Sequence, residues 1–109
     1  PLRLPAHADG NSTHAWHLYV VRLTDDAPLA RDELIAKLSE RGIGTSVHFI
    51  PLHLHPYYRK GFGFRPRDFP NAAAASERII SLPLYPKMGK AGVRDVISAV
   101  RKIAERHRR

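Results

Sequence analysis

The sequence contains no cysteine among its 109 residues, which excludes a disulfide scaffold, a zinc ribbon and a thiol nucleophile. This absence also agrees with a cytoplasmic setting. No apolar run approaches the roughly 20 residues that a helix needs to span a bilayer, so we expect no membrane partner. Acidic residues are scarce, because 10 Asp and Glu stand against 18 Lys and Arg, and the net charge is +8. Such an excess is typical either of a solvated, arginine-rich surface or of a surface that binds an acidic partner.

The first half of the sequence predicts a polar N-terminal segment followed by a strand and a helix. Residues 1–13 are polar and turn-rich, and we expect a linker or arm there rather than core. Residues 15–23 are rich in aromatic and β-branched side chains, which favours a strand with a buried face. Residues 30–41 have the apolar spacing of an amphipathic helix, and Gly42 is placed to end it. The apolar positions of this helix are Leu34, Ile35 and Leu38.

The second half predicts two more strands and two more helices around an irregular loop. Residues 44–49 and 80–84 have the composition of short strands, and residues 51–69 form the loop between them and the next helix. An alanine-rich helix follows Pro70 over residues 71–79, and residues 92–105 predict the last helix. The apolar stripe of that last helix consists of Val93, Val96, Ile97, Val100, Ile103 and Ala104.

This order of elements predicts one α/β (α+β) domain built as a two-layer sandwich. A small, mixed or antiparallel three-stranded sheet would be flanked by helices, since strands and helices alternate over short connections. The length suffices to bury a core without disulfides or metal. No Gly-rich dinucleotide fingerprint and no phosphate-binding loop of the nucleotide hydrolases occurs in the sequence.

The segment 42–58 concentrates histidine and tyrosine where the second predicted strand runs into the loop. A packed core does not need this density of protonatable side chains, so the segment is a candidate ligand site. A metal site is one alternative, formed by His48, His53 and His55 with help from His14 and His17. However, no carboxylate lies between residues 40 and 68, and no serine stands in a Gly-x-Ser-x-Gly elbow. We therefore assign no metal ligand and no catalytic residue.

A second alternative is a free-standing basic domain that binds nucleic acid or another anionic partner. Aromatic and basic side chains interleave over residues 57–69, as they do where bases stack and phosphates are neutralised. Aromatic residues beside Gly and Pro in a loop also commonly form a small satellite core. We favour the satellite core and regard nucleic acid as an unlikely partner.

Six motifs in register give a more specific indication. Together they closely resemble the C-terminal domain of the DegT/StrS family of pyridoxal-phosphate-dependent sugar aminotransferases, over nearly all the chain from residue 14 to about residue 104. The motifs are His14-Ala-Trp-His-Leu-Tyr-Val-Val-Arg22, Arg31-Asp-Glu-Leu-Ile35, Arg41-Gly-Ile-Gly-Thr45, His48-Phe-Ile-Pro-Leu-His53, Tyr57-Tyr-Arg59 and Ser81-Leu-Pro-Leu-Tyr-Pro86.

The resemblance implies the small domain of a type I aminotransferase fold, with residues 14–109 as that domain and residues 1–13 as a linker or arm from a missing large domain. Family members bind pyridoxal phosphate and transfer an amino group from glutamate to a nucleotide-linked keto sugar in surface polysaccharide or amino-sugar synthesis. The family's large N-terminal domain supplies the cofactor lysine, and none of the five lysines here stands in that context. We therefore expect a truncated chain that is inactive alone and binds no cofactor.

The resemblance also implies which residues meet the substrate. His48 matches the first histidine of a His-aromatic-x-Pro-x-His motif and would hydrogen-bond the sugar or its phosphates, and Tyr57 matches a tyrosine near the same substrate. His53 is a third substrate-binding candidate, for which a structural role at the Pro51 turn is equally open. The implied partners are the nucleotide-sugar substrate, the chain's own large domain and a second subunit of a homodimer.

Overall fold

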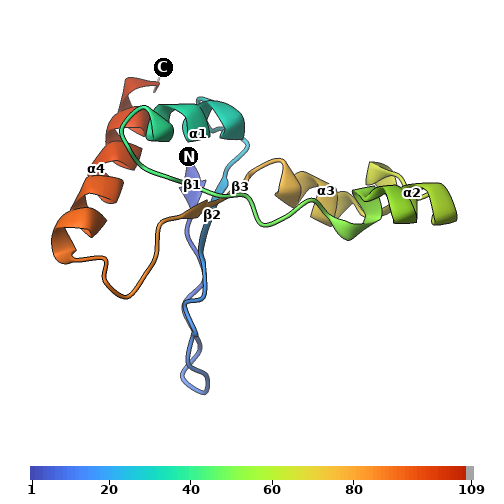
Figure 1. Cartoon of the computed structure of the whole chain (residues 1–109), viewed down its shortest axis with the longest axis horizontal. Helices are drawn as coiled ribbons and strands as arrows, with labels where there is room; N and C mark the ends of the chain where they lie inside the picture. Colours follow the sequence, from blue (N-terminus) through green and yellow to red (C-terminus); the bar gives the residue numbers. More distant parts are fainter. Residues whose placement is uncertain (108–109) are drawn as a thin grey trace.

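A computed structural model describes residues 1–107 and contains a three-stranded antiparallel sheet of order β1-β2-β3 (Figure 1). In the register, Leu2 pairs with Leu23 between β1 and β2, and Val21 pairs with Ile80 between β2 and β3. This architecture confirms the α/β class and the antiparallel alternative for the sheet. The elements in chain order are β1 (Leu2–Arg3), β2 (Tyr19–Leu23), α1 (Arg31–Ser39), η1 (Leu52–Leu54), α2 (Pro56–Phe62), η2 (Pro66–Asp68), α3 (Pro70–Ser76), β3 (Ile79–Leu82) and α4 (Lys90–Arg106).

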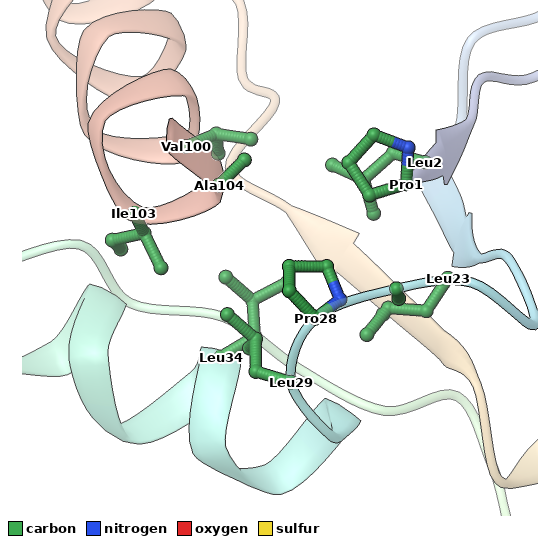
Figure 2. A pocket seen from close by; sticks show the side chains of 10 residues that line it. Pro1, Leu2, Leu23, Pro28, Leu29, Leu34, Val100, Ile103 and Ala104 are labelled. Atoms are coloured by element: carbon green, nitrogen blue, oxygen red, sulfur yellow. The ribbon is translucent and has the colours of Figure 1, made fainter. Parts of the chain in front are cut away.

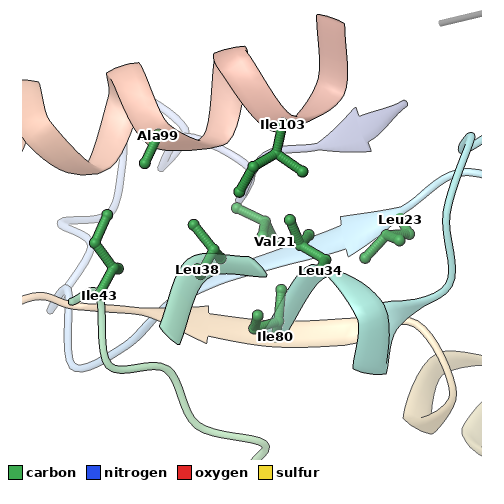
Figure 3. Packing of buried hydrophobic residues seen from close by; sticks show 8 residues of the cluster. All are labelled: Val21, Leu23, Leu34, Leu38, Ile43, Ile80, Ala99 and Ile103. Atoms are coloured by element: carbon green, nitrogen blue, oxygen red, sulfur yellow. The ribbon is translucent and has the colours of Figure 1, made fainter. Parts of the chain in front are cut away.

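Helices α1 and α4 cover one face of the sheet, and the core lies between them and the strands (Figure 3). Alternate residues of β2 and β3 point into this core, as the two-residue period of a strand requires. Leu38 and Ile80 are fully buried at its centre. The cluster consists of Val21, Leu23, Leu34, Leu38, Ile43, Ile80, Ala99 and Ile103.

Gly42 ends α1 as its position in the sequence predicts. It adopts φ 72°, in the left-handed region that glycine enters without a Cβ penalty. Its N–H donates to the carbonyl of Ser39, and the N–H of Ile43 donates to the carbonyl of Leu38. These two bonds satisfy carbonyls at the end of the helix and turn Ile43 back into the core.

Two expectations about the strands need correction, and the structure adds one finding about a covering helix. Residues 2–3 form β1, although we expected no strand in the segment 1–13. Residues 44–49 do not form a strand, because only Ser46 pairs with β3, through a single bridge to Ser81. The apolar stripe of α4 is buried only in part, since Val93 and Ile97 are exposed.

The other elements are present with shifted boundaries. Strand β2 begins four residues after the predicted start at residue 15, and α1 is shorter than residues 30–41 by one residue at its start and two at its end. Helix α2 lies within the segment 51–69, which we expected to be an irregular loop, and α3 begins at Pro70 as predicted but ends at residue 76. Strand β3 begins one residue before the predicted start and ends at residue 82, and α4 is longer than residues 92–105 by one to two residues at each end.

Two parts of the chain extend away from the sheet and its two covering helices. The arm (residues 4–18) connects β1 to β2 as a long protrusion, and the wing (residues 49–76) carries α2 and α3 to one side (Figure 1). The radius of gyration is 16.0 Å, whereas a compact domain of this length has about 13 Å. The arm and the wing therefore present more surface than a self-contained domain needs.

A small apolar cavity lies where the start of β1, the start of α1 and the end of α4 meet (Figure 2). Its volume is about 20 Å³, the space of a single water molecule, and its walls offer almost no polar group. Leu2, Leu23, Leu34, Val100 and Ala104 are among its lining residues. This cavity is a packing defect of the core and has no ligand-binding groups.

Within residues 1–107, no helix combines the length and the apolarity that crossing a membrane requires.

Candidate functional site

His48 is joined to strand β3 by a hydrogen bond between side chains. Its Nδ1 lies 2.9 Å from the hydroxyl oxygen of Ser81, a residue only 5% exposed. His48 itself is half-buried, and within residues 1–107 its Nε2 has no hydrogen-bond partner. One ring nitrogen is therefore anchored in the fold while the other is free to bind a ligand.

The backbone around Ser46 holds this part of the chain against β3. The N–H of Ser46 donates to the carbonyl of Ser81 at 3.1 Å, and the N–H of Ser81 donates to the carbonyl of Ser46 at 2.8 Å. His48 follows two residues later, where the chain leaves the sheet toward the wing. The bridge thus fixes the distance between the imidazole and β3, which a free loop would not do.

His53 lies inside an aromatic cluster of the wing and is 6% exposed. Its ring is 4.9 Å from the ring of Phe69, and Phe64 lies 5.1 Å from Phe69 on the other side. Its Nε2 is buried and has no hydrogen-bond partner among the described residues. This burial fits the structural alternative for His53 better than direct contact with a substrate. It also fits the satellite core expected for the aromatic residues of the loop.

Tyr57 lies at the start of α2 and is 73% exposed. Its ring contacts Tyr58 at 5.1 Å and Phe62 at 6.1 Å, both edge to face. These contacts hold one side of the ring, and the rest of the side chain faces outward. Tyr57 is therefore available to a ligand, whereas His53 is not.

Two of the other candidate histidines, His14 and His55, make local hydrogen bonds. His14 accepts a hydrogen bond from the N–H of Trp16 at 2.8 Å, and its ring stacks on the indole at 4.0 Å. The Nε2 of His55 donates to the carbonyl of Ile50 at 3.1 Å. His17 is exposed on the arm. Among residues 1–107 no three His, Asp or Glu side chains form a group that could hold a metal ion.

The lysines of the chain do not form a site for pyridoxal phosphate. Lys37 pairs with Glu33 on the outside of α1 at 3.5 Å. The other four are exposed, on the wing, on the loop after β3 and along α4: Lys60, Lys87, Lys90 and Lys102. No lysine faces the Ser81–His48 pair from a buried position, so this chain offers no group that could bond covalently to the cofactor there.

A concavity of about 420 Å³ opens at the end of α2 on the wing. Arg59, Lys60 and Arg65 bring three cationic groups to it, and all three are exposed. Solvent screens such groups, so the concavity has positive charge without the burial of a formed anion site. It also lies at the carboxyl end of a helix, where the partial charge of the backbone is negative.

Sequence analysis assigned no role to Ser81. Its only signal was its place in the motif of residues 81–86, because a contact 33 residues away from His48 leaves no local pattern. The structure shows that Ser81 provides the side-chain hydrogen bond that anchors His48 to β3.

Comparison with known proteins gives a consistent assignment. The model of the DegT/DnrJ/EryC1/StrS aminotransferase family matches residues 1–101. Spore coat polysaccharide biosynthesis protein SpsC of Bacillus subtilis is 54% identical over 101 residues, which are 91% of this chain and 25% of that protein. The chain therefore spans about a quarter of the length of the relatives it matches.

Solved structures agree in fold over nearly the whole chain. The putative sugar aminotransferase Spr1654 from Streptococcus pneumoniae, in the PMP-form, matches with a TM-score of 0.85 at 30% identity, over 98% of this chain and 27% of that one. DesV of S. venezuelae matches with a TM-score of 0.82 at 35% identity, over 95% of this chain and 26% of that one.

Proposed function

Because the chain belongs to the DegT/DnrJ/EryC1/StrS aminotransferase family, we propose that it works as the small C-terminal domain of a pyridoxal-phosphate-dependent sugar aminotransferase. In this proposal residues 14–109 are the small domain, and residues 1–13 connect it to a large domain while contributing β1 to the sheet. The whole protein transfers an amino group from glutamate to a nucleotide-linked keto sugar, in the synthesis of a surface polysaccharide or an amino sugar. The names of SpsC and Spr1654 support polysaccharide synthesis and a sugar substrate, respectively.

The contribution of this chain to the reaction is to position the substrate. The free Nε2 of His48 reaches the sugar or its phosphates from a ring that β3 holds in place, and Tyr57 adds a phenol from the wing. Fixing the carbonyl in the right orientation supplies catalysis by proximity, without any proton transfer from this domain. His53 supports the segment between these two residues from inside the aromatic cluster. The anchored, half-exposed imidazole of His48 is the observation that carries this proposal.

The cofactor belongs to the rest of the protein. Pyridoxal phosphate supplies the electron sink for amino transfer, and the lysine that binds it comes from the large domain, because none here is suitably buried. We infer that this chain alone has no aminotransferase activity. The expected cytoplasmic location remains a prediction.

The proposed protein partners are the large domain and the second subunit of a homodimer. The arm and the wing carry most of the exposed apolar side chains, and large apolar surface of this kind is typical of interaction sites. The exposed apolar residues on these two parts are Leu4, Trp16, Phe49, Ile50, Leu52, Tyr57, Phe62 and Phe69. We expect this chain, studied alone, to self-associate through them. A monodisperse monomer in light scattering would argue against both partners.

The decisive experiment measures amino transfer by the protein produced from its complete reading frame. Glutamate is the donor and a nucleotide-linked 4-keto sugar is the acceptor. His48→Ala should raise KM for the sugar or lower kcat/KM, while the absorbance of the bound cofactor stays unchanged. His107→Ala is the matched control, because the contacts of His107 lie between α4 and α1 and not at His48: it bonds the carbonyl of Ile103, and its Nε2 lies 3.9 Å from a carboxylate oxygen of Glu33.

Two results would contradict the proposal. A complete protein that binds no pyridoxal phosphate would refute the aminotransferase assignment itself. Unchanged kinetics in His48→Ala would leave the assignment intact and refute the substrate contact of His48.

A further inference from the structure

Ser81 is placed so that its hydroxyl group can bond to His48 and not to the core. The residue lies in β3 beside Ile80, which points into the core, so the alternation of the strand turns Ser81 to the opposite face of the sheet. Both of its backbone polar groups are bonded to Ser46. Its hydroxyl is bonded to Nδ1 of His48, the single side-chain partner found for it among residues 1–107.

This arrangement determines which ring nitrogen of His48 carries the proton. A hydroxyl group has one O–H to donate, and leaving a buried donor unpaired is costly. Ser81 is 5% exposed, and His48 is the single side-chain partner of its hydroxyl among residues 1–107, so the arrangement that leaves no donor of Ser81 unpaired is the one in which its O–H donates to Nδ1. Nδ1 is then an acceptor, and in the neutral ring the proton lies on Nε2.

We propose that Ser81 is a positioning residue that holds His48 in the Nε2–H tautomer, so that His48 acts as a hydrogen-bond donor to an acceptor oxygen of the substrate. This inference rests on the proposed function for the identity of the ligand. The tautomer itself follows from the contacts of this chain alone. The Nε2–H tautomer predicts that the site prefers a ligand with an acceptor oxygen at that position, such as a phosphate or carbonyl oxygen. A ligand whose group there can only donate should bind less well.

The tautomer can be measured by NMR on this chain with nitrogen-15 in its histidine rings, in buffer of about pH 8.5, where an ordinary imidazole is neutral. We expect the His48 signals of an unprotonated Nδ1 and a protonated Nε2. In Ser81→Ala the two tautomers should mix, and in Ser81→Thr, which keeps the hydroxyl, the original signals should return. Ser76→Ala is the matched control, since it removes a part-buried hydroxyl that donates to the carbonyl of Ala73 and has no contact with His48.

The kinetic arm uses the complete protein. Losing one oriented hydrogen bond should lower kcat/KM for the keto sugar by about two- to tenfold in Ser81→Ala. The loss should fall on the sugar and not on glutamate, Ser81→Thr should restore it, and Ser76→Ala should show none of it. A purely structural role would instead lower activity toward both substrates and shift the unfolding temperature in parallel.

Each outcome decides the inference. It fails if His48 of the unaltered chain carries its proton on Nδ1, or if Ser81→Ala leaves the tautomer unchanged. It also fails if Ser81→Ala leaves the kinetics unchanged while His48→Ala impairs them. If the complete protein proves to be no aminotransferase, the proposed function fails, and the NMR result still decides whether Ser81 sets the tautomer.

Discussion

Replacing Gly42 by alanine tests the link between the end of α1 and the segment that leads to His48. Gly42 has φ 72°, and a Cβ built at this position meets no atom within 4 Å. The cost of the substitution is therefore conformational and not steric. A left-handed residue other than glycine costs about 1–2 kcal/mol, so the free energy of unfolding should fall by about that amount.

Gly44 provides the control two residues away. A Cβ at Gly44 also meets no atom within 4 Å, and its φ lies outside the left-handed region. Gly44→Ala should therefore leave stability unchanged or raise it by about 0.4–1 kcal/mol, because alanine reduces the freedom of the unfolded chain. Gly42→Asn should recover part of the loss, since asparagine tolerates this conformation better than alanine does.

Urea unfolding followed by circular dichroism measures these differences as shifts of the midpoint at constant slope. In a domain of this size the loss in Gly42→Ala should lower the melting temperature by about 4–8 °C for each kcal/mol. Equal effects of Gly42→Ala and Gly44→Ala would refute the reasoning. They would show that the loss of any glycine, and not the left-handed turn, matters in this segment.

Three further predictions concern the core, the arm and the wing. Val100→Ile adds one methylene beside the apolar cavity of about 20 Å³ and should raise the free energy of unfolding by up to about 0.8 kcal/mol; a lower urea midpoint would show that the cavity cannot accept it. On the arm, the Ser12 hydroxyl and the N–H of Asn11 donate to the Asp9 carboxylate and lower its pKa, so Ser12→Ala should raise that pKa toward its ordinary value in an NMR titration. Because folding lowers this pKa, the bonds to Asp9 stabilise the folded state at pH values above the ordinary pKa of Asp, and this stabilisation is lost as the pH falls. An unchanged titration in Ser12→Ala would contradict the hydrogen bond from Ser12 to Asp9. In the wing, amides of α2 should exchange with deuterium faster than those of β3, since α2 has no buried residue; equal protection would show that wing and sheet unfold together.

The helices were predictable from the sequence because their signals are local. Apolar spacing located α1 and α4, Pro70 located the start of α3, and Gly42 located the end of α1. The apolar stripe of α4 did not indicate that two of its residues are exposed. Periodicity shows which residues share a face but not how much of that face a partner covers, so the exposure of Val93 and Ile97 was unforeseen.

The strands were less predictable because pairing depends on distant parts of the chain. Residues 2–3 are too few to signal a strand and stand between Pro1 and Pro5, and they form β1 only because residues 22–23 lie alongside. Residues 44–49 have the composition of a strand, yet only Ser46 pairs with β3 before the chain turns toward the wing. Composition indicates how favourable a residue is in a strand. Whether the residue pairs with a neighbouring strand depends on the path of the chain in the fold.

The residues of the candidate site were nominated from the sequence, and their contact with a substrate stays a prediction, whereas the construction of the site could not be predicted. The motif and the composition both indicated His48 and Tyr57 as candidates. His53, the third candidate, differs from these two because it is buried. The bond from Ser81 to His48 joins β3 to a segment 33 residues earlier, so no local pattern contains it. Only the fold brings the two side chains together.

His48 and Tyr57 approach the proposed substrate from parts of the chain that are held in different ways. His48 is fixed through Ser81 and the Ser46 bridge to the central sheet, so its position is set by the same core that holds the domain together. Tyr57 stands on a seven-residue helix without a buried residue, and the contacts of that helix are with η1 of the same wing. A rigid donor and an adjustable phenol suit a site that must align one reacting carbonyl while accepting different groups around it. The order of the wing would then come from the large domain or the second subunit that covers its exposed aromatic side chains. It follows that partner contacts should affect the contribution of Tyr57 more than that of His48.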